Sequence, residues 1–157
     1  MRLFVLALLL VGCGGPPAPL AHALVLSGLA NDGGTAPLVD GQDVTLVAGA
    51  QGGFHVWLRY AYDGPAAAAT LTRTAHRLSD DALVLRSSAD VTVGPLSDPL
   101  PMFMCPSPIG ISVVDTPIAY TLDLTDGSDA PLASGTITLV PRCPEDEATF
   151  CQQICTG

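Results

Sequence analysis

Short runs of alternating hydrophobic and polar residues, separated by turns, dominate this chain. The turns are marked by Gly, Pro, Asp and Ser, and the runs are rich in Val, Thr, Leu and Ile with a period near two. No stretch before residue 144 has a convincing helical period of adequate length. The segments expected to form strands are 24–29, 43–48, 54–62, 69–77, 82–86, 90–93, 109–114, 118–124 and 135–140.

Many short strands without intervening helices predict an all-β sandwich or barrel. Residues 121–124 and 136–139 flank the turn Asp126-Gly127-Ser128-Asp129, which indicates a hairpin. Gly41-Gln42-Asp43 begins a strand as in many immunoglobulin-like modules, and the architecture of residues 24–142 resembles theirs. We therefore expect an immunoglobulin-like antiparallel β-sandwich of about seven to nine strands, although a jelly roll would produce the same pattern.

The start of the chain has a different pattern, which is typical of an export signal. Arg2 precedes an uncharged apolar run over residues 3–11, and small residues follow in Gly12-Cys13-Gly14-Gly15. This run is shorter than the about 20 apolar residues that a membrane-spanning helix needs. Residues 1–12 are therefore expected to be a signal peptide.

The end of this signal, Leu10-Val11-Gly12-Cys13, resembles the lipobox of bacterial lipoproteins, although Val11 stands where Ala or Ser is commoner. The resemblance implies that the Cys13 thiol receives a diacylglycerol and that cleavage occurs just before it. Several acyl chains would then hold the protein at the membrane, because each buried methylene contributes about 0.8 kcal/mol. Gly14, in place of the Asp that marks inner-membrane retention, favours the outer membrane.

Composition and charge exclude one class of function, nucleic-acid binding. The chain has no lysine, and six arginines face fifteen acidic residues, which gives a formal net charge of −9. Such a surface repels phosphate backbones, so nucleic-acid binding is not expected. We expect residues 13–23 to form a lipidated cysteine with a Gly/Pro tether, residues 24–142 to form the sandwich, and residues 143–157 to form a Cys-rich tail packed on it.

The cysteines after Cys13 are expected to form two disulfides, since their number is even and the compartment is oxidising. Four cysteines allow three pairings. A helix running continuously from Pro144 would place Cys143 about 12 Å along the axis from Cys151, too far for a bridge, whereas a later helix start would permit it. A zinc site is disfavoured because the C-x-x-C spacing is missing. The cysteines concerned are Cys105, Cys143, Cys151 and Cys155.

One predicted strand, 54–62, carries a candidate binding surface. Alternation places Phe54 and every second residue after it in the core, and directs His55, Trp57 and Arg59 to the opposite face. Aromatic residues and arginine are enriched at binding hot spots, and the Gly-rich loop 49–53 precedes the strand. The alternatives are a half-covered face with Arg59 stacked on Trp57, or a Trp57 buried between the sheets.

A second candidate is a copper site. Met102 and Met104 offer soft sulfur ligands that suit Cu(I), and His76 or His55 could add nitrogen, but methionines at this spacing are more often core residues. The motifs of serine hydrolases, zinc proteases and phosphate-binding loops are missing from the sequence, so neither catalysis nor a cofactor is expected. We expect a non-catalytic cell-envelope lipoprotein that binds an envelope protein or polymer or has a structural role, with a periplasmic copper-binding lipoprotein as the alternative.

Overall fold

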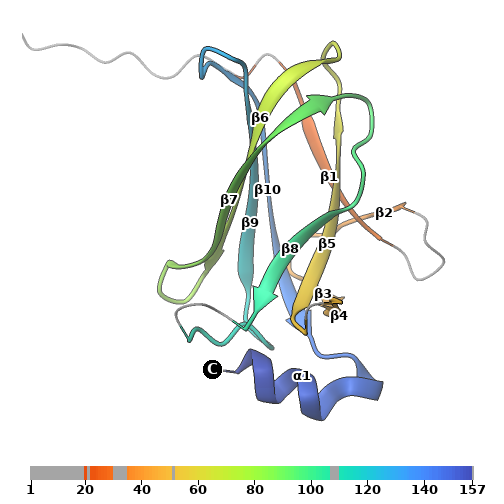
Figure 1. Cartoon of the computed structure of the whole chain (residues 1–157), viewed down its shortest axis with the longest axis vertical. Coiled ribbons are helices and arrows are strands. Elements are labelled where there is room, and N and C mark those ends of the chain that lie inside the picture. Colours follow the sequence, from red (N-terminus) through yellow and green to blue (C-terminus); the bar gives the residue numbers. More distant parts are fainter. Residues whose placement is uncertain (1–19, 21, 30–34, 51, 107–109, 157) are drawn as a thin grey trace, which may run out of the picture.

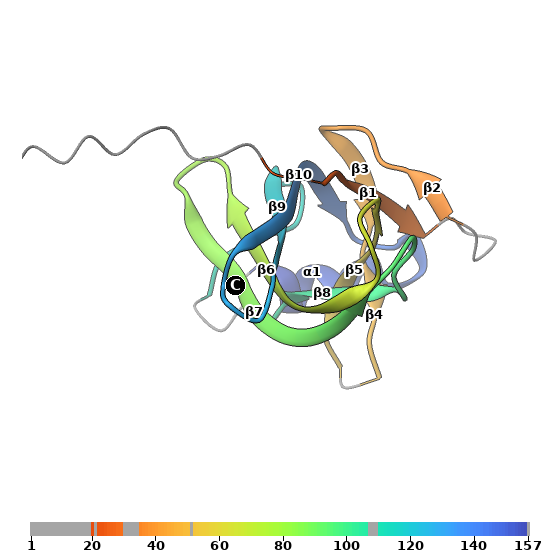
Figure 2. The ribbon, with the colours of Figure 1, turned by 90° about the horizontal axis from the view of Figure 1, so that it is seen from above.

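Two β-sheets stacked face to face form the body of the protein, and a short helix lies across one end (Figures 1 and 2). The computed structural model describes residues 20, 22–29, 35–50, 52–106 and 110–156. The strands are β1 (Leu24–Leu29), β2 (Thr35–Pro37), β3 (Gln42–Thr45), β4 (Val47–Ala48), β5 (Phe54–Tyr62), β6 (Ala67–Arg77), β7 (Ala82–Val93), β8 (Leu100–Cys105), β9 (Ile118–Thr125) and β10 (Pro131–Arg142).

The strand order is that of an immunoglobulin-like sandwich. One sheet contains β2, β1, β5 and β4 in that order, with β8 also paired to β5, and the other has the order β3-β10-β9-β6-β7. The run β10-β9-β6-β7 corresponds to strands G, F, C and C′ of variable-type domains, and β1, β5 and β8 correspond to A, B and E of the facing sheet. The predicted all-β sandwich is therefore confirmed.

Two details of the sandwich differ from expectation. The described residues contain ten strands, more than the seven to nine expected, because β2, β3 and β4 are short pieces at the sheet margins. The pairing is also not purely antiparallel, since β3 runs parallel to β10 with Gln42 beside Leu139. This pairing arises because the chain crosses from one sheet to the other between β1 and β3.

The core lies between the two sheets and follows the predicted alternation. Buried and half-buried residues alternate along all of β5 and β9. Tyr120 of β9 is fully buried, and its hydroxyl donates to Met104 Sδ at 3.0 Å. Burial raises the pKa of Tyr120, so the ring stays neutral and serves as a core side chain.

Residues 109–114 were expected to form a strand, and this expectation is wrong for the part that the structure describes. Residues 110–114 form a loop in which Ile111, Val113 and Val114 are buried. The Val113 amide donates to the Cys155 carbonyl at 3.3 Å instead of entering a sheet. The apolar residues of this segment thus cover the end of the core rather than extending a sheet.

The hairpin expected around residues 126–129 joins β9 to β10. Asp126 Oδ1 accepts hydrogen bonds from the amides of Ser128 at 2.8 Å and Ala130 at 3.0 Å. The hydrogen bond from the Ser128 hydroxyl, followed by these two backbone bonds, lowers the pKa of the Asp126 carboxyl. The carboxylate therefore closes the turn by satisfying backbone donors.

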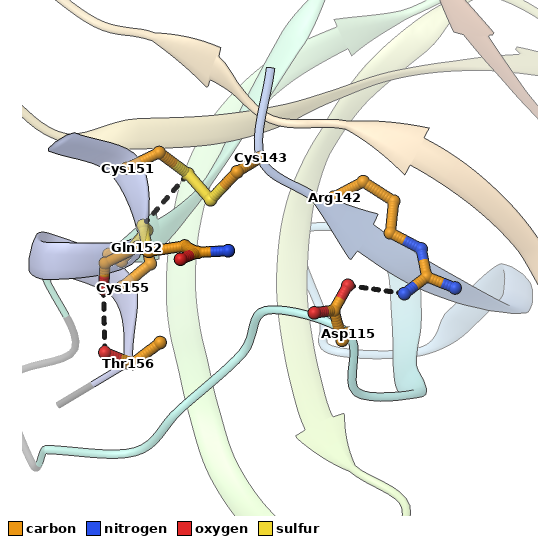
Figure 3. The surroundings of a disulfide bond; sticks show 8 residues. Asp115, Arg142, Cys143, Cys151, Gln152, Cys155 and Thr156 are labelled. Atoms are coloured by element: carbon orange, nitrogen blue, oxygen red, sulfur yellow. Dashed lines mark hydrogen bonds and ion pairs between the residues drawn. A yellow bond between two sulfur atoms is a disulfide. The ribbon is translucent and has the colours of Figure 1, made fainter. Parts of the chain in front are cut away.

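Two disulfides fix the C-terminal segment, which confirms their predicted number. They join Cys105 to Cys155 and Cys143 to Cys151, with Cα–Cα distances of 5.0 and 5.7 Å. The second pairing is possible because the α-helix α1 begins only at Ala148, after the 3₁₀ turn Glu145–Glu147, and ends at Cys155. Both helical cysteines point toward the sandwich, as Figure 3 shows, and their side chains are buried.

The N-terminal side of the domain lies at the end opposite to α1 (Figure 1). There the His22 ring lies 5.3 Å from the Tyr62 ring, and the Ala23 amide donates to Asp63 Oδ1 at 2.8 Å. These contacts fix the chain just before β1 beside the β5–β6 turn. Within the described part of the chain, no helix is both long enough and apolar enough to span a membrane.

Candidate functional site

Strand β5 places the three predicted surface residues side by side on the outside of its sheet. Phe54, Val56 and the following alternate residues of β5 are buried, whereas His55, Trp57 and Arg59 are half-buried and face outward. Trp57 therefore does not lie between the two sheets.

Cross-strand pairing builds an aromatic cluster around His55. In the sheet register, His55 lies beside Phe103 of β8 and Val47 of β4, and Trp57 lies beside Pro101. The His55 ring centroid is 5.3 Å from that of Phe103 and 6.1 Å from that of Trp57. The spacing is that of contacting aromatic rings, which prefer edge-on or tilted arrangements.

The cluster belongs to a larger surface that we call the apolar face. Val25 is 62% exposed, Val47 is 47% exposed and Leu29 is 38% exposed. Among the described strand residues of this face, Arg59 is the one charged side chain. The apolar face consists of Val25, Ser27, Leu29, Val47, His55, Trp57, Arg59, Ala61, Pro101 and Phe103.

The outer face of the opposite sheet is chemically different. Its threonine, serine and aspartate side chains bond to one another across neighbouring strands, so many of its polar groups are already satisfied. The pairs are Thr70 with Asp90 at 3.3 Å, Thr72 with Ser88 at 2.9 Å, Thr121 with Thr136 at 2.9 Å, and Ser134 with Asp123 at 2.6 Å. The sandwich thus has one polar outer face and one apolar outer face.

Two hollows flank Trp57. The first has a volume of about 580 Å³ and lies between β5 and the β1–β4 segment, with Leu29, Val47 and the polar Gln42 in its wall. The second has a volume of about 470 Å³ and is lined by His55, Phe103 and the loop after β4. Trp57 lines both, but the wall of the first hollow also contains the buried Val56 and residues of β3, so this hollow lies at the margin of the sheet, whereas the second lies on its outer face.

Two polar atoms of the face are buried without hydrogen-bond partners in the described part of the chain. Burial lowers the pKa of His55, which favours the neutral ring at pH 7. Within the described residues, His55 Nδ1 and Arg59 Nε are buried and have no hydrogen-bond partner. Unpaired buried polar atoms reduce the stability of the fold, and because these two atoms have almost no exposed surface they are not contact points for a partner.

The glycine-rich loop after β4 is packed onto this cluster. Its ends are closed by a hydrogen bond from the Gly49 amide to the Gly53 carbonyl at 2.7 Å. A Cβ at Gly49 would lie 2.3 Å from His55 Nε2, and one at Gly53 would lie 2.5 Å from Phe103 Cε2 and 2.7 Å from the Cys105 carbonyl oxygen. Glycine is required here because the backbone touches the rings.

We predict that Gly53→Ala lowers the free energy of unfolding by about 1 to 3 kcal/mol, the usual cost of overpacking. The Cys105 carbonyl is backbone and cannot move aside as a flexible side chain would. Gly127→Ala is the matched control, since nothing lies within 4 Å of its added Cβ. Urea titration measures both, and equal losses for the two variants would refute the close packing.

The residues of the copper alternative do not come together. Met102 and Met104 are fully buried in the core. His76 lies on the outer face of the other sheet, with its Nδ1 3.1 Å from Asp81 Oδ1. In the part of the chain that the structure describes, no group of three or more His, Cys, Asp or Glu side chains is arranged to hold a metal ion.

Sequence alternation located only the β5 part of the apolar face. Phe103, Val47 and Val25 join it through strand pairing, for which the sequence carries no local signal beyond their hydrophobic character. No protein-family model, curated protein or solved structure matches the chain, so its immunoglobulin-like assignment rests on the order and pairing of its strands.

Proposed function

We propose that this protein is a non-catalytic, lipid-anchored module of the bacterial cell envelope that binds a partner through its apolar face. The observation that carries this proposal is the contrast between the two outer faces of the sandwich. An aromatic surface without acidic side chains among its described strand residues is unusual on a chain with a net charge of −9, and extended exposed apolar surfaces mark interaction sites. Trp57 beside Arg59 supplies the residue types that dominate binding hot spots.

The position of the proposed anchor relative to the aromatic cluster supports a binding role for the apolar face. Cys13, the proposed lipidation site, precedes the end of the domain that lies opposite to α1 (Figure 1). The aromatic cluster lies nearer the α1 end, since Phe54 at the start of β5 contacts Phe150 of α1 with 6.0 Å between ring centroids. An anchor at Cys13, at the outer membrane as the lipobox context favours, would therefore present the cluster away from the attachment point. No observation favours copper binding, because Met102 and Met104 are enclosed in the core.

The anchor is tested by Cys13→Ser. Because the serine hydroxyl cannot replace the thiol as the acceptor of diacylglycerol, we expect an unlipidated product that is uncleaved or soluble. Metabolic labelling with a radioactive fatty acid should mark the parent and leave the variant unmarked. Label retained on the Cys13→Ser protein would overturn the assignment of the anchor.

The binding surface is tested by photo-crosslinking in intact cell envelopes. A benzoylphenylalanine at position 57 should give adducts of higher mass, because position 57 lies at the centre of the apolar face. The same group at exposed position 136, on the polar outer face, is the matched control and should give none. Equal adduct yields at the two positions, or adducts only at position 136, would count against the proposed surface.

A further inference from the structure

We propose that the two disulfides at the end of the sandwich form a redox relay, in which cleavage of the Cys143–Cys151 bond by a dithiol leads Cys151 to break the Cys105–Cys155 bond as well. The two bonds are neighbours, since the Sγ atoms of Cys151 and Cys155 lie 3.9 Å apart and are joined by a dashed line in Figure 3. This inference is independent of the apolar face, because it concerns the opposite chemistry and another part of the molecule.

Exposure decides where the exchange starts. Cys105, Cys151 and Cys155 are at most 1% exposed, whereas Cys143 is half-buried. A disulfide is cleaved when a thiolate reaches one of its two sulfurs, so access limits the reaction. Cys143 is therefore the point of entry for an external thiol, and the bond between Cys143 and Cys151 is the first to be attacked.

The exchange then proceeds from sulfur to sulfur. One thiolate of the dithiol bonds to Cys143 Sγ, and the electron pair of the broken bond leaves on Cys151 Sγ. The Cys151 thiolate attacks Cys155 Sγ, which forms a Cys151–Cys155 bond and releases Cys105 as a thiolate. The second thiolate of the dithiol attacks its own sulfur on Cys143 and releases the Cys143 thiolate. The dithiol is oxidised to its disulfide, and its two protons pass to Cys105 and Cys143, which end as thiols.

The position of the two cysteines on α1 permits the new bond. Cys151 and Cys155 are one helical turn apart, which places their Cα atoms about 6 Å from each other, within the range that a disulfide allows. Their Cβ atoms must approach from about 5–6 Å to about 3.5–4.5 Å. Cys155 is the last residue of α1, so this closure distorts only the final turn. The freed Cys151 side chain can turn about its Cα–Cβ bond to align with the bond that it attacks.

The relay would release α1 from the sandwich. Cys105 is the last residue of β8, so its bridge to Cys155 links the helix covalently to that strand. After the exchange, both sulfurs of the new bond belong to α1. Contacts such as the hydrogen bond of 3.3 Å from the Val113 amide to the Cys155 carbonyl would then hold the helix without a covalent link. A dithiol that reacts at Cys143 would thus loosen the end of the core.

Partial reduction followed by peptide mapping tests the relay. The chain from residue 13, carrying Cys13→Ser, is treated with an equimolar amount of dithiothreitol, quenched with acid and labelled with N-ethylmaleimide. Trypsin then cuts after Arg142, which places Cys105 in the peptide 87–142 and the other three cysteines in the peptide 143–157. Mass spectrometry shows whether the two peptides are still joined and which cysteines carry the label.

The relay predicts that the two peptides separate, with label on Cys105 and Cys143 and a bond between Cys151 and Cys155. Without a relay, the exposed bond alone would open, so that Cys143 and Cys151 carry the label while the peptides stay joined through Cys105 and Cys155. That second pattern would overturn the proposal. A chain that takes up no label would also overturn it, because the entry point at Cys143 would then be closed.

The double variant Cys143→Ala/Cys151→Ala separates the relay from a purely structural role of the short bridge. We expect Cys105 to be labelled at least about tenfold more slowly than in the parent, because the intramolecular attack by Cys151 is lost. If the short bridge only held α1 in place, its loss would instead speed up reduction of the longer bridge. Circular dichroism checks that the variant is folded, and the mapping of the parent chain does not depend on it. Labelling of Cys105 in the folded variant at the parental rate or faster would overturn the relay.

Discussion

Replacing Cys105 and Cys155 together by alanine should lower the free energy of unfolding by about 4 kcal/mol, the largest effect that we expect from removing one covalent link. The bridge spans 50 residues, so it removes much conformational freedom from the unfolded chain. The bridge between Cys143 and Cys151 spans 8 residues, and its removal should cost only about 2.5 kcal/mol. Urea denaturation of both double variants under oxidising conditions measures the difference.

In thermal melts, the longer bridge should account for a drop of about 10 °C, since each kcal/mol shifts the midpoint of a domain of this size by about 2 to 4 °C. The shorter bridge should produce a clearly smaller shift. A larger loss on removing Cys143 and Cys151 would contradict the observed pairing. It would mean that the short bridge, rather than the long one, holds α1 on the end of the sandwich.

Leu58→Ala and Trp57→Ala should have very different effects although the two residues are neighbours in β5. Leu58 is fully buried, so its truncation leaves a cavity and should cost about 3 to 5 kcal/mol. Trp57 faces outward and is half-buried, so its loss should cost about 1 kcal/mol, the typical loss for a single substitution. Urea titration measures both, and a loss at Trp57 equal to that at Leu58 would show that the indole is a core side chain.

Alternation predicted β5 correctly because a period of two is a local signal and each residue of 54–62 obeys it. Strand β7 was expected as two pieces, 82–86 and 90–93, because the polar residues between them resemble a turn; Ser87 and Ser88 instead pair with Arg73 and Thr72 of β6. Strand β8 was not expected, since Pro101 interrupts its pattern. Proline is tolerated because β8 pairs only with β5 among the described strands.

The remaining features depend on contacts between distant segments. The pairing of Cys105 with Cys155 could not be read from spacing, because it follows from where α1 begins and how it covers the end of the sandwich. The approach of Phe103 to His55 depends on the register of β8 against β5. Sequence reasoning therefore found the centre of the candidate site but not its extent.

If the proposed function is correct, a partner in the cell envelope covers the apolar face. Hydroxyl-radical footprinting tests this most directly, comparing the anchored protein in isolated envelopes with the purified Cys13→Ser chain in dilute solution. We predict that oxidation of Trp57, Phe103 and Leu29 falls several-fold in the envelope, while that of the exposed Phe150 on α1 stays the same. Equal oxidation of Trp57, Phe103 and Leu29 in both preparations, or protection confined to Phe150, would contradict the account.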